Sequence, residues 1–113
     1  MTKSHDNNRK SLIMDADANS LKELTQIPGV GKSIARDFIE IGVKSVQDLK
    51  GRNPEILYEL INKKKGIIQD RCLLYVFRCA VYYASTEKSA RQQDKLKWWN
   101  WTDLKMFGEI RNI

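Results

Sequence analysis

The sequence predicts an all-α domain, and three observations lead to that fold class. Apolar residues recur at helical spacing from residue 19 to residue 84. No segment alternates with period two for long enough to indicate a strand. Cap and stop residues divide the chain into helix-sized pieces. With 113 residues, 42% of them hydrophobic, the chain is expected to form one small domain around a modest core.

Three short helices are expected in the first half of the chain. The first spans residues 19–27 and is stopped by Pro28 and the glycine after it. The second spans 32–41 and ends at Gly42, a residue that helix C-caps prefer. The third spans 45–50 and begins with a serine that is followed three residues later by an aspartate, which resembles a capping box.

Two further helices are expected in the second half. Asn53 suits an N-cap and Pro54 suits the first helical position, so the fourth helix should span 54–62. The fifth spans 69–84 and carries apolar residues nearly all round its circumference. A helix with so wide an apolar surface belongs at the centre of a domain.

These elements divide the chain into three parts. Residues 1–18 are polar and are expected to form a mobile tail. Residues 19–84 form the helical domain, and residues 85–113 form a loop followed by a Trp-rich segment packed on that domain. Its tryptophans are expected to close over the core, although a partner-binding patch, a membrane-interface anchor and stacking platforms remain open alternatives. They are Trp98, Trp99 and Trp101.

The net charge of +6 lies entirely outside the N-terminal tail. Residues 1–18 hold three basic and three acidic residues, whereas residues 19–84 hold eleven and seven, and residues 85–113 hold six and four. Such a modest excess suits a protein that makes a few contacts with an anionic partner.

Composition also argues against several classes of protein. The longest apolar stretch is shorter than the roughly 20 residues of a membrane span, and the N-terminus lacks the apolar core of a secretory signal, so we expect a cytoplasmic protein without a membrane partner. Cys72 and Cys79 stand too far apart on one helix for a disulfide and are expected to be small buried side chains. His5 is the single histidine, so no metal site and no catalytic triad is expected, and the chain is not expected to be an enzyme.

The most informative segment is the Pro-Gly-Val-Gly-Lys-Ser turn between the first two helices. Its glycines allow a ligand to approach the main chain, and the helix that follows points its free N–H groups and positive dipole end into the same place. A lysine and a serine add a cation and a hydroxyl, so the predicted ligand is a phosphate. The candidate residues are Gly29, Val30, Gly31, Lys32 and Ser33.

Two better-known phosphate loops do not fit this turn. A Walker A loop would need glycine in place of Gln26, and a dinucleotide fingerprint would need glycine in place of Ile34 and a preceding strand. A plain corner between two helices remains the alternative.

The turn resembles the helix-hairpin-helix motif of DNA repair and recombination proteins. That motif has the pattern hydrophobic-x-Gly-hydrophobic-Gly with alanine four residues further on, and Ile27, Gly29, Val30, Gly31 and Ala35 fill it. The resemblance implies that the N–H groups of the hairpin bind a backbone phosphate of DNA without reading its sequence. In some members carbonyls of the hairpin hold a monovalent cation, which here would be those of Ile27 and Val30; no other cofactor is expected.

Members of that family usually pair two such motifs, and a degenerate second copy follows. Aligning the apolar repeats places Lys64, Lys65, Gly66 and Ile67 over the first turn, so one glycine is retained and the other is lost. The expected fold is therefore a double helix-hairpin-helix domain of five helices. The basic run Lys63, Lys64 and Lys65 would provide a secondary site of point-charge contacts, or else a solvated turn.

A more specific resemblance covers nearly everything after residue 19. The segments I-P-G-V-G-K, N-P-E-I-L-Y-E-L, D-R-C-L-L-Y-V-F-R-C-A-V-Y-Y-A and K-W-W-N-W-T-D resemble a small bacterial family, the pathogenicity-locus helix-hairpin-helix proteins. The resemblance implies a bacterial cytoplasmic protein that binds DNA.

One further stripe is open to two interpretations. Arg71, Tyr75, Arg78 and Tyr82 follow one another at helical spacing and could bind a nucleic acid strand. Alternatively, the tyrosines cover the core and both arginines pair with carboxylates.

The sequence as a whole favours a protein that binds duplex or structured DNA through phosphates, without sequence specificity. The alternative is a protein-protein interaction adaptor that uses the Trp cluster or an exposed helix face. The accessory domain of an enzyme is a third option.

Overall fold

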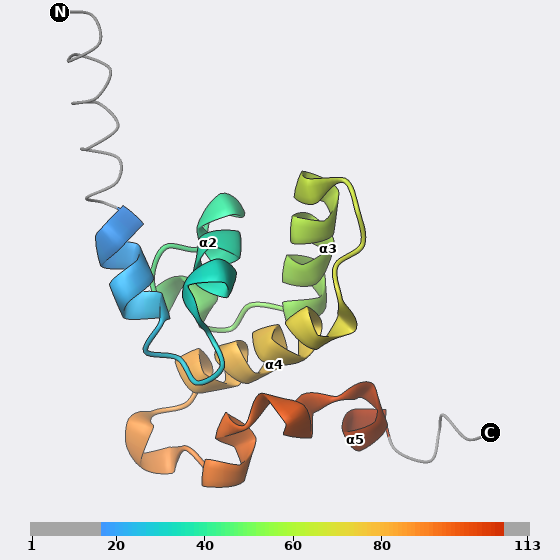
Figure 1. Ribbon diagram of the computed structural model, residues 1–113. Helices are drawn as coiled ribbons and strands as arrows, with labels where there is room; N and C mark the ends of the chain where they lie inside the picture. Colours follow the sequence, from blue (N-terminus) through green and yellow to red (C-terminus); the bar gives the residue numbers. More distant parts are fainter. Residues whose placement is uncertain (1–16, 108–113) are drawn as a thin grey trace, which may run out of the picture.

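The computed structural model describes residues 17–107, which are helical with connecting turns and contain no strand (Figure 1). The all-α prediction is therefore confirmed. Most of the expected N-terminal tail lies outside the described residues, but Asp17 and Ala18 belong to the first helix, which spans residues 17–24. No described helix has the length and apolar character needed to cross a membrane.

The remaining elements follow in the expected order. The principal helices are α2 (Lys32–Glu40), α3 (Pro54–Lys65) and α4 (Arg71–Ser85). Short 3-10 turns and one brief helix make up the rest, namely η1 (Gln47–Leu49), η2 (Lys88–Ala90), η3 (Gln93–Leu96), η4 (Trp98–Trp101) and α5 (Asp103–Phe107).

The third expected helix is a single 3-10 turn, η1, instead of a helix over residues 45–50. The serine cap works as expected, since Ser45 Oγ accepts a hydrogen bond from the N–H of Asp48 at 3.2 Å. The chain leaves the helical conformation already at Lys50, whose ψ is 123°, and Gly51 follows with a left-handed φ of 73°, so no α-helical turn is completed.

Helix α3 begins where the sequence predicts and ends later. The Asn53 side chain accepts hydrogen bonds from the N–H groups of Glu55 and Ile56 at 2.9 and 3.4 Å. The helix then continues through Lys65 and stops at Gly66, which has a left-handed φ of 73°. The prediction of a turn at Lys63–Lys65 was wrong. Lysine is a good helix former, and its positive charge is favourable at the C-terminal end of a helix.

Helix α4 is the centre of the domain, as its apolar circumference predicts. The helix of residues 17–24, α2 and α3 pack on one side of α4, and the C-terminal segment runs along the other side (Figure 1). Phe38 of α2 stacks on Phe77 of α4 with ring centroids 4.6 Å apart. The fully buried core residues include Leu24, Ile27, Phe38, Val43, Leu49, Leu57, Ile61, Leu74 and Phe77.

Arg78 fastens the C-terminal segment to the core. It is 3% exposed, and its guanidinium lies 2.8 Å from Glu55 of α3 and 2.9 Å from Asp103 of α5. Arg71 makes a second pair with Asp103 at 2.7 Å. These hydrogen bonds, chiefly those from Arg71, lower the pKa of Asp103 to about 2. Of the two interpretations of this stripe, the pairing of both arginines with carboxylates is the one that the structure contains.

The two cysteines are both free thiols, but they differ in burial. Cys79 is buried as expected, and desolvation raises the pKa of its thiol to about 11. Cys72 is exposed, which corrects the expectation that both side chains are buried. It lies in the first turn of α4, where its N–H donates to the capping carboxylate of Asp70 at 2.8 Å.

Candidate nucleic-acid interface

The Pro-Gly turn between the first two helices is a tight type II turn. The N–H of Val30 donates to the carbonyl of Ile27 at 3.0 Å, and Gly29 has a φ of 86°. A type II turn needs proline-like geometry at its second residue and a φ near +80° at its third, which Pro28 and Gly29 provide. The apolar residues Ile27 and Val30 are buried and hold the turn to the core.

The N-terminus of α2 lacks the protection that the other two principal helices have. Asn53 caps α3 and Asp70 caps α4, whereas α2 has no side-chain cap and no acidic residue in its first turn. Its first backbone hydrogen bond runs from Ala35 N–H to the carbonyl of Gly31 at 2.9 Å. The amide groups of the preceding residues therefore remain available to an anion, and the helix dipole favours one.

The two glycines of the turn have different structural roles. A Cβ on Gly29 would lie 3.0 Å from Cδ1 of Trp98, and the residue has a left-handed φ. A Cβ on Gly31 would meet nothing within 4 Å, and the φ of this residue is an ordinary −89°. The fold thus requires glycine at position 29, while the surface over Gly31 is open to a ligand.

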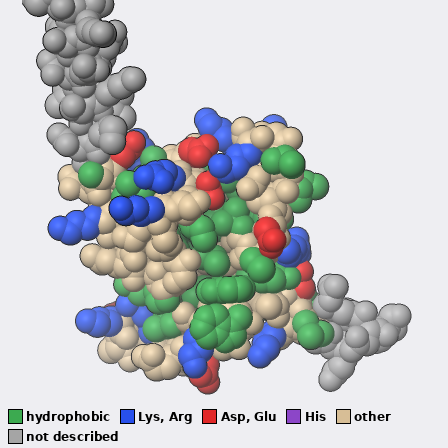
Figure 2. All heavy atoms as spheres, in the orientation of Figure 1, with side chains coloured by type: hydrophobic (Ala, Val, Ile, Leu, Met, Phe, Trp, Pro, Cys, Tyr) green, Lys and Arg blue, Asp and Glu red, His purple; other side chains and the backbone are tan. Residues whose placement is uncertain are grey.

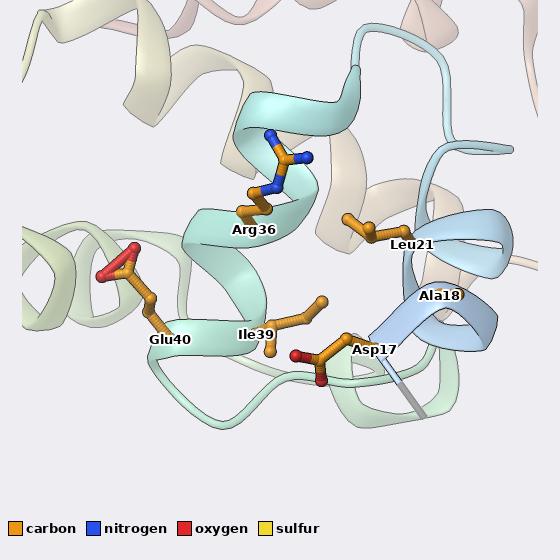
Figure 3. Close-up of a pocket in the computed structure, with 6 residues that line it drawn as sticks. All are labelled: Asp17, Ala18, Leu21, Arg36, Ile39 and Glu40. Carbon is orange, nitrogen blue, oxygen red and sulfur yellow. The ribbon is translucent and has the colours of Figure 1, made fainter. Parts of the chain in front are cut away.

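Three side chains supply polar or positively charged groups beside this open amide site. Lys32 and Ser33 are exposed at the start of α2, as the sequence predicts. Arg36 follows Lys32 one turn later on the same face, and its guanidinium extends toward the N-terminal end of α2 (Figure 3). Sequence reasoning missed Arg36, although its spacing of four residues from Lys32 was a signal that could have identified it.

A largely apolar hollow of about 360 Å³ lies between the helix of residues 17–24 and α2 (Figure 3). Leu21 and Ile39 form part of its wall, and Arg36 lies at the side nearer to the turn. The hollow therefore adjoins the amide site without containing it.

The three lysines of the expected secondary site do not act as one group. Lys65 lies 3.2 Å from Asp37 and 3.6 Å from Glu40, and the hydrogen bond with Asp37 is the main cause that raises the pKa of Lys65 above its usual value. Lys63 and Lys64 are exposed. Because Asp37 and Glu40 belong to the C-terminal half of α2, these lysines lie at the end of α2 opposite to the turn (Figure 1).

Arg71 and Arg78, named as further candidates for a nucleic-acid contact, have other partners. The Arg78 guanidinium is enclosed between Glu55, Asp103 and the carbonyl of Trp101. Arg71 is half exposed but paired with Asp103 through two hydrogen bonds of 2.7 and 3.1 Å. Both arginines therefore serve to hold the C-terminal segment in place.

The C-terminal segment brings unexpected residues to the turn. The Trp98 indole packs on Gly29 and on the core, and Trp99 meets it edge to face with centroids 5.8 Å apart. Lys97, directly before them, is exposed. Hydrophobic side chains lie across the middle and lower part of this face, and Lys and Arg side chains lie both above them and along the lower edge (Figure 2). No local pattern in the sequence links residue 98 with residue 29.

The carbonyl of Ile27, one of the two groups expected to hold a monovalent cation, already accepts the hydrogen bond from Val30 that closes the turn. A carbonyl oxygen has a second lone pair, so this bond alone does not prevent a further contact. The cation stays a prediction.

The fold and the site define a small all-α protein with an uncapped helix N-terminus at a glycine-containing turn. The chain belongs to the Cdd1 pathogenicity locus family, whose match extends over residues 17–106. It is 34% identical over 80 residues to the mitomycin resistance protein McrB of Streptomyces lavendulae, an alignment that covers 71% of this chain and 70% of that protein. No solved structure matches the chain.

Proposed function

We propose that this protein binds DNA without sequence specificity, by holding a backbone phosphate at the N-terminus of α2. The observation that carries the proposal is the contrast among the principal helices: α3 and α4 are capped by side chains, whereas α2 is uncapped. Gly31 at this terminus is exposed, and a Cβ on it would meet nothing within 4 Å, so no side chain covers that side of the turn. A phosphate oxygen accepts uncapped N–H groups and gains from the helix dipole.

The charges around the turn support the same ligand. Lys32 and Arg36 bring two cations to the start of α2, and Ser33 brings a hydroxyl. Contacts of this kind position a protein on the sugar-phosphate backbone but carry no sequence information. Residues 17–40 would then form a helix-hairpin-helix motif, which agrees with the pattern of the turn.

The second helix pair would make a weaker contact. Lys63 and Lys64 lie within the degenerate repeat and are exposed, but Lys65 is paired with carboxylates of α2. The lysines and the turn lie at opposite ends of α2. They therefore cannot both bind the same phosphate of a DNA strand. The two sites would instead contact separate phosphates along a duplex.

A salt titration with a fluorescent duplex tests the proposal. If two or three phosphates are engaged, log K should fall with log salt concentration with a slope of about −0.9 for each of them. Lys32→Glu should weaken the binding of unrelated duplexes equally. Lys44→Glu is the matched control, because Lys44 is an exposed lysine that lies beyond the other end of α2. An affinity that does not depend on salt concentration would contradict the proposal. So would a Lys32→Glu variant that loses affinity for one DNA sequence alone.

A protein-protein adaptor is the second candidate, and one observation favours it. Ile67 and Ile68 are 68% and 79% exposed in the connection between α3 and α4. Exposed apolar surface that is contiguous is a feature of protein-interaction sites. Replacing both by serine should abolish binding to a protein partner while leaving the affinity for DNA unchanged.

The relative's name suggests a test in cells. We propose that this chain also contributes to resistance to mitomycin. Cells that lack the protein should then survive the drug less well than cells that express it, and the Lys32→Glu variant should fail to restore survival.

A further inference from the structure

We propose that Trp99 is a stacking platform for an unpaired base beside the phosphate site, so that the favoured substrate is duplex DNA with a single-stranded extension. This inference rests on the proposed function and names its substrate class. The three tryptophans of the C-terminal segment differ in their burial.

Two of the three tryptophans have structural roles that the fold explains. Trp98 is partly buried and packs against the core and Gly29. Trp101 is partly buried, tilts against Tyr82 with centroids 5.5 Å apart, and donates its indole N–H to the carbonyl of Lys95 at 2.9 Å. Both rings therefore contribute to closing the segment over α4.

Trp99 is the exception, since it is 52% exposed. Its aromatic contact among the described residues is the edge-to-face arrangement with Trp98. Leaving so large an apolar ring in water is unfavourable. An exposed tryptophan held by a well-packed neighbour offers a rigid apolar surface on which a flat ligand can stack.

The position of Trp99 indicates which flat ligand it would receive. Trp98 contacts Gly29, and Trp99 contacts Trp98, so a single indole separates Trp99 from the phosphate turn. Lys97 adds a positive charge directly before the two rings. A phosphate site, an exposed aromatic ring and a cation next to that ring in the sequence are elements of single-strand recognition.

Base pairing determines which DNA can use this ring. In a duplex the bases are stacked on one another, so their faces are not available to Trp99. A single-stranded extension lets one strand keep its phosphate on the turn while its next base rotates onto the indole. The phosphate site would thus hold any DNA, and Trp99 would favour DNA with an unpaired end.

The test compares the affinities of two labelled DNAs for the full chain at one low salt concentration. One is a blunt duplex, and the other is the same duplex with an extension of about six nucleotides, tested at the 3′ and at the 5′ end. The wild type should bind one of the extended forms about 5- to 100-fold more tightly, since stacking of a base on an aromatic ring supplies a gain of that size. Trp99→Ala should remove the preference and leave the blunt-duplex affinity unchanged.

Two variants control for other effects. Trp99→Phe keeps an aromatic ring and should retain most of the preference. Ile68→Ala removes an even more exposed apolar side chain, in the connection between α3 and α4, and should leave the preference intact.

The outcomes separate this inference from the proposed function. Equal binding of blunt and extended DNA by the wild type would overturn the role of Trp99 while salt-dependent duplex binding still stood. The role of Trp99 would also be overturned if the Trp99→Ala variant kept the preference for extended DNA. The same holds if that variant lost affinity for blunt and extended DNA equally. If neither DNA binds at low salt, the proposed function fails and the inference fails with it.

Discussion

Gly29 and Trp98, which are 69 residues apart, meet so closely that a Cβ on the glycine would lie 3.0 Å from Cδ1 of the indole. The glycine belongs to the turn before α2, and the tryptophan belongs to the segment that runs along α4. The contact joins the N-terminal turn to the C-terminal segment.

The first prediction concerns the two glycines of the turn. Gly29→Ala should lower the free energy of unfolding by about 1–2 kcal/mol for the left-handed backbone alone, and Trp98 must also move. Gly31→Ala should change it by less than about 1 kcal/mol, because a poorer N-cap and a less flexible unfolded chain offset each other. Urea denaturation followed by tryptophan fluorescence measures both values. Equal destabilisation by the two substitutions would contradict the structure of the turn.

The second prediction concerns the carboxylate that fastens the C-terminal segment. Asp103→Asn should destabilise the protein by about 1–3 kcal/mol at neutral pH, because Arg78 stays buried with Glu55 as its one remaining carboxylate partner. The sign of the pH dependence follows from the lowered pKa of Asp103, about 2 against an ordinary 3.8. The stabilisation is complete above about pH 5 and is lost as pH falls toward 2.

Unfolding curves of the wild type and the Asp103→Asn variant between pH 7 and pH 2 measure this effect. The difference between their free energies of unfolding should shrink as the wild-type carboxylate becomes protonated. A constant difference across that range would show that the charge of Asp103 does not hold the segment.

The third prediction distinguishes the two thiols. In the folded protein Cys72 is exposed and Cys79 is buried with a pKa of about 11, so a disulfide reagent at pH 8 should modify one thiol quickly and the other slowly. Adding denaturant should make both react fast. In the Cys72→Ser variant the fast phase should be missing; a fast phase that persists would place Cys79 at the surface.

The fourth prediction concerns the cap of α3. Asn53→Ala removes the acceptor for two backbone N–H groups and should cost about 0.5–2 kcal/mol. Asn53→Asp keeps an acceptor at the same position and should leave the stability close to that of the wild type. Thermal unfolding by circular dichroism compares the two variants, and equal losses would mean that the cap contributes nothing.

Local sequence signals predicted much of the helical framework. Asn53 caps α3, Pro28 and Gly29 form the turn, and α4 occupies the centre, because each of these depends on residues close together in the chain. The end of α3 was predicted wrongly because the lysine run was taken for a turn. The left-handed Gly66 is what ends that helix.

The tertiary partners of the candidate site could not be predicted in this way. Lys65 is neutralised by carboxylates of α2, and Arg78 by carboxylates of α3 and α5, and each partner is more than 20 residues away in the sequence. Charge counting cannot distinguish an exposed lysine from a paired one. The packing of Trp98 on Gly29 likewise depends on the whole fold.

The most direct test of phosphate binding at α2 is a titration of the ¹⁵N-labelled protein with a short duplex, followed by its amide NMR signals. The amides of Gly31, Lys32 and Ser33 should shift first and saturate together, and the shifts should be reversed by salt. The amides of Lys44 and of the capped N-terminus of α3 should move little. Shifts confined to other surfaces, with the amides at the start of α2 unmoved, would contradict the account.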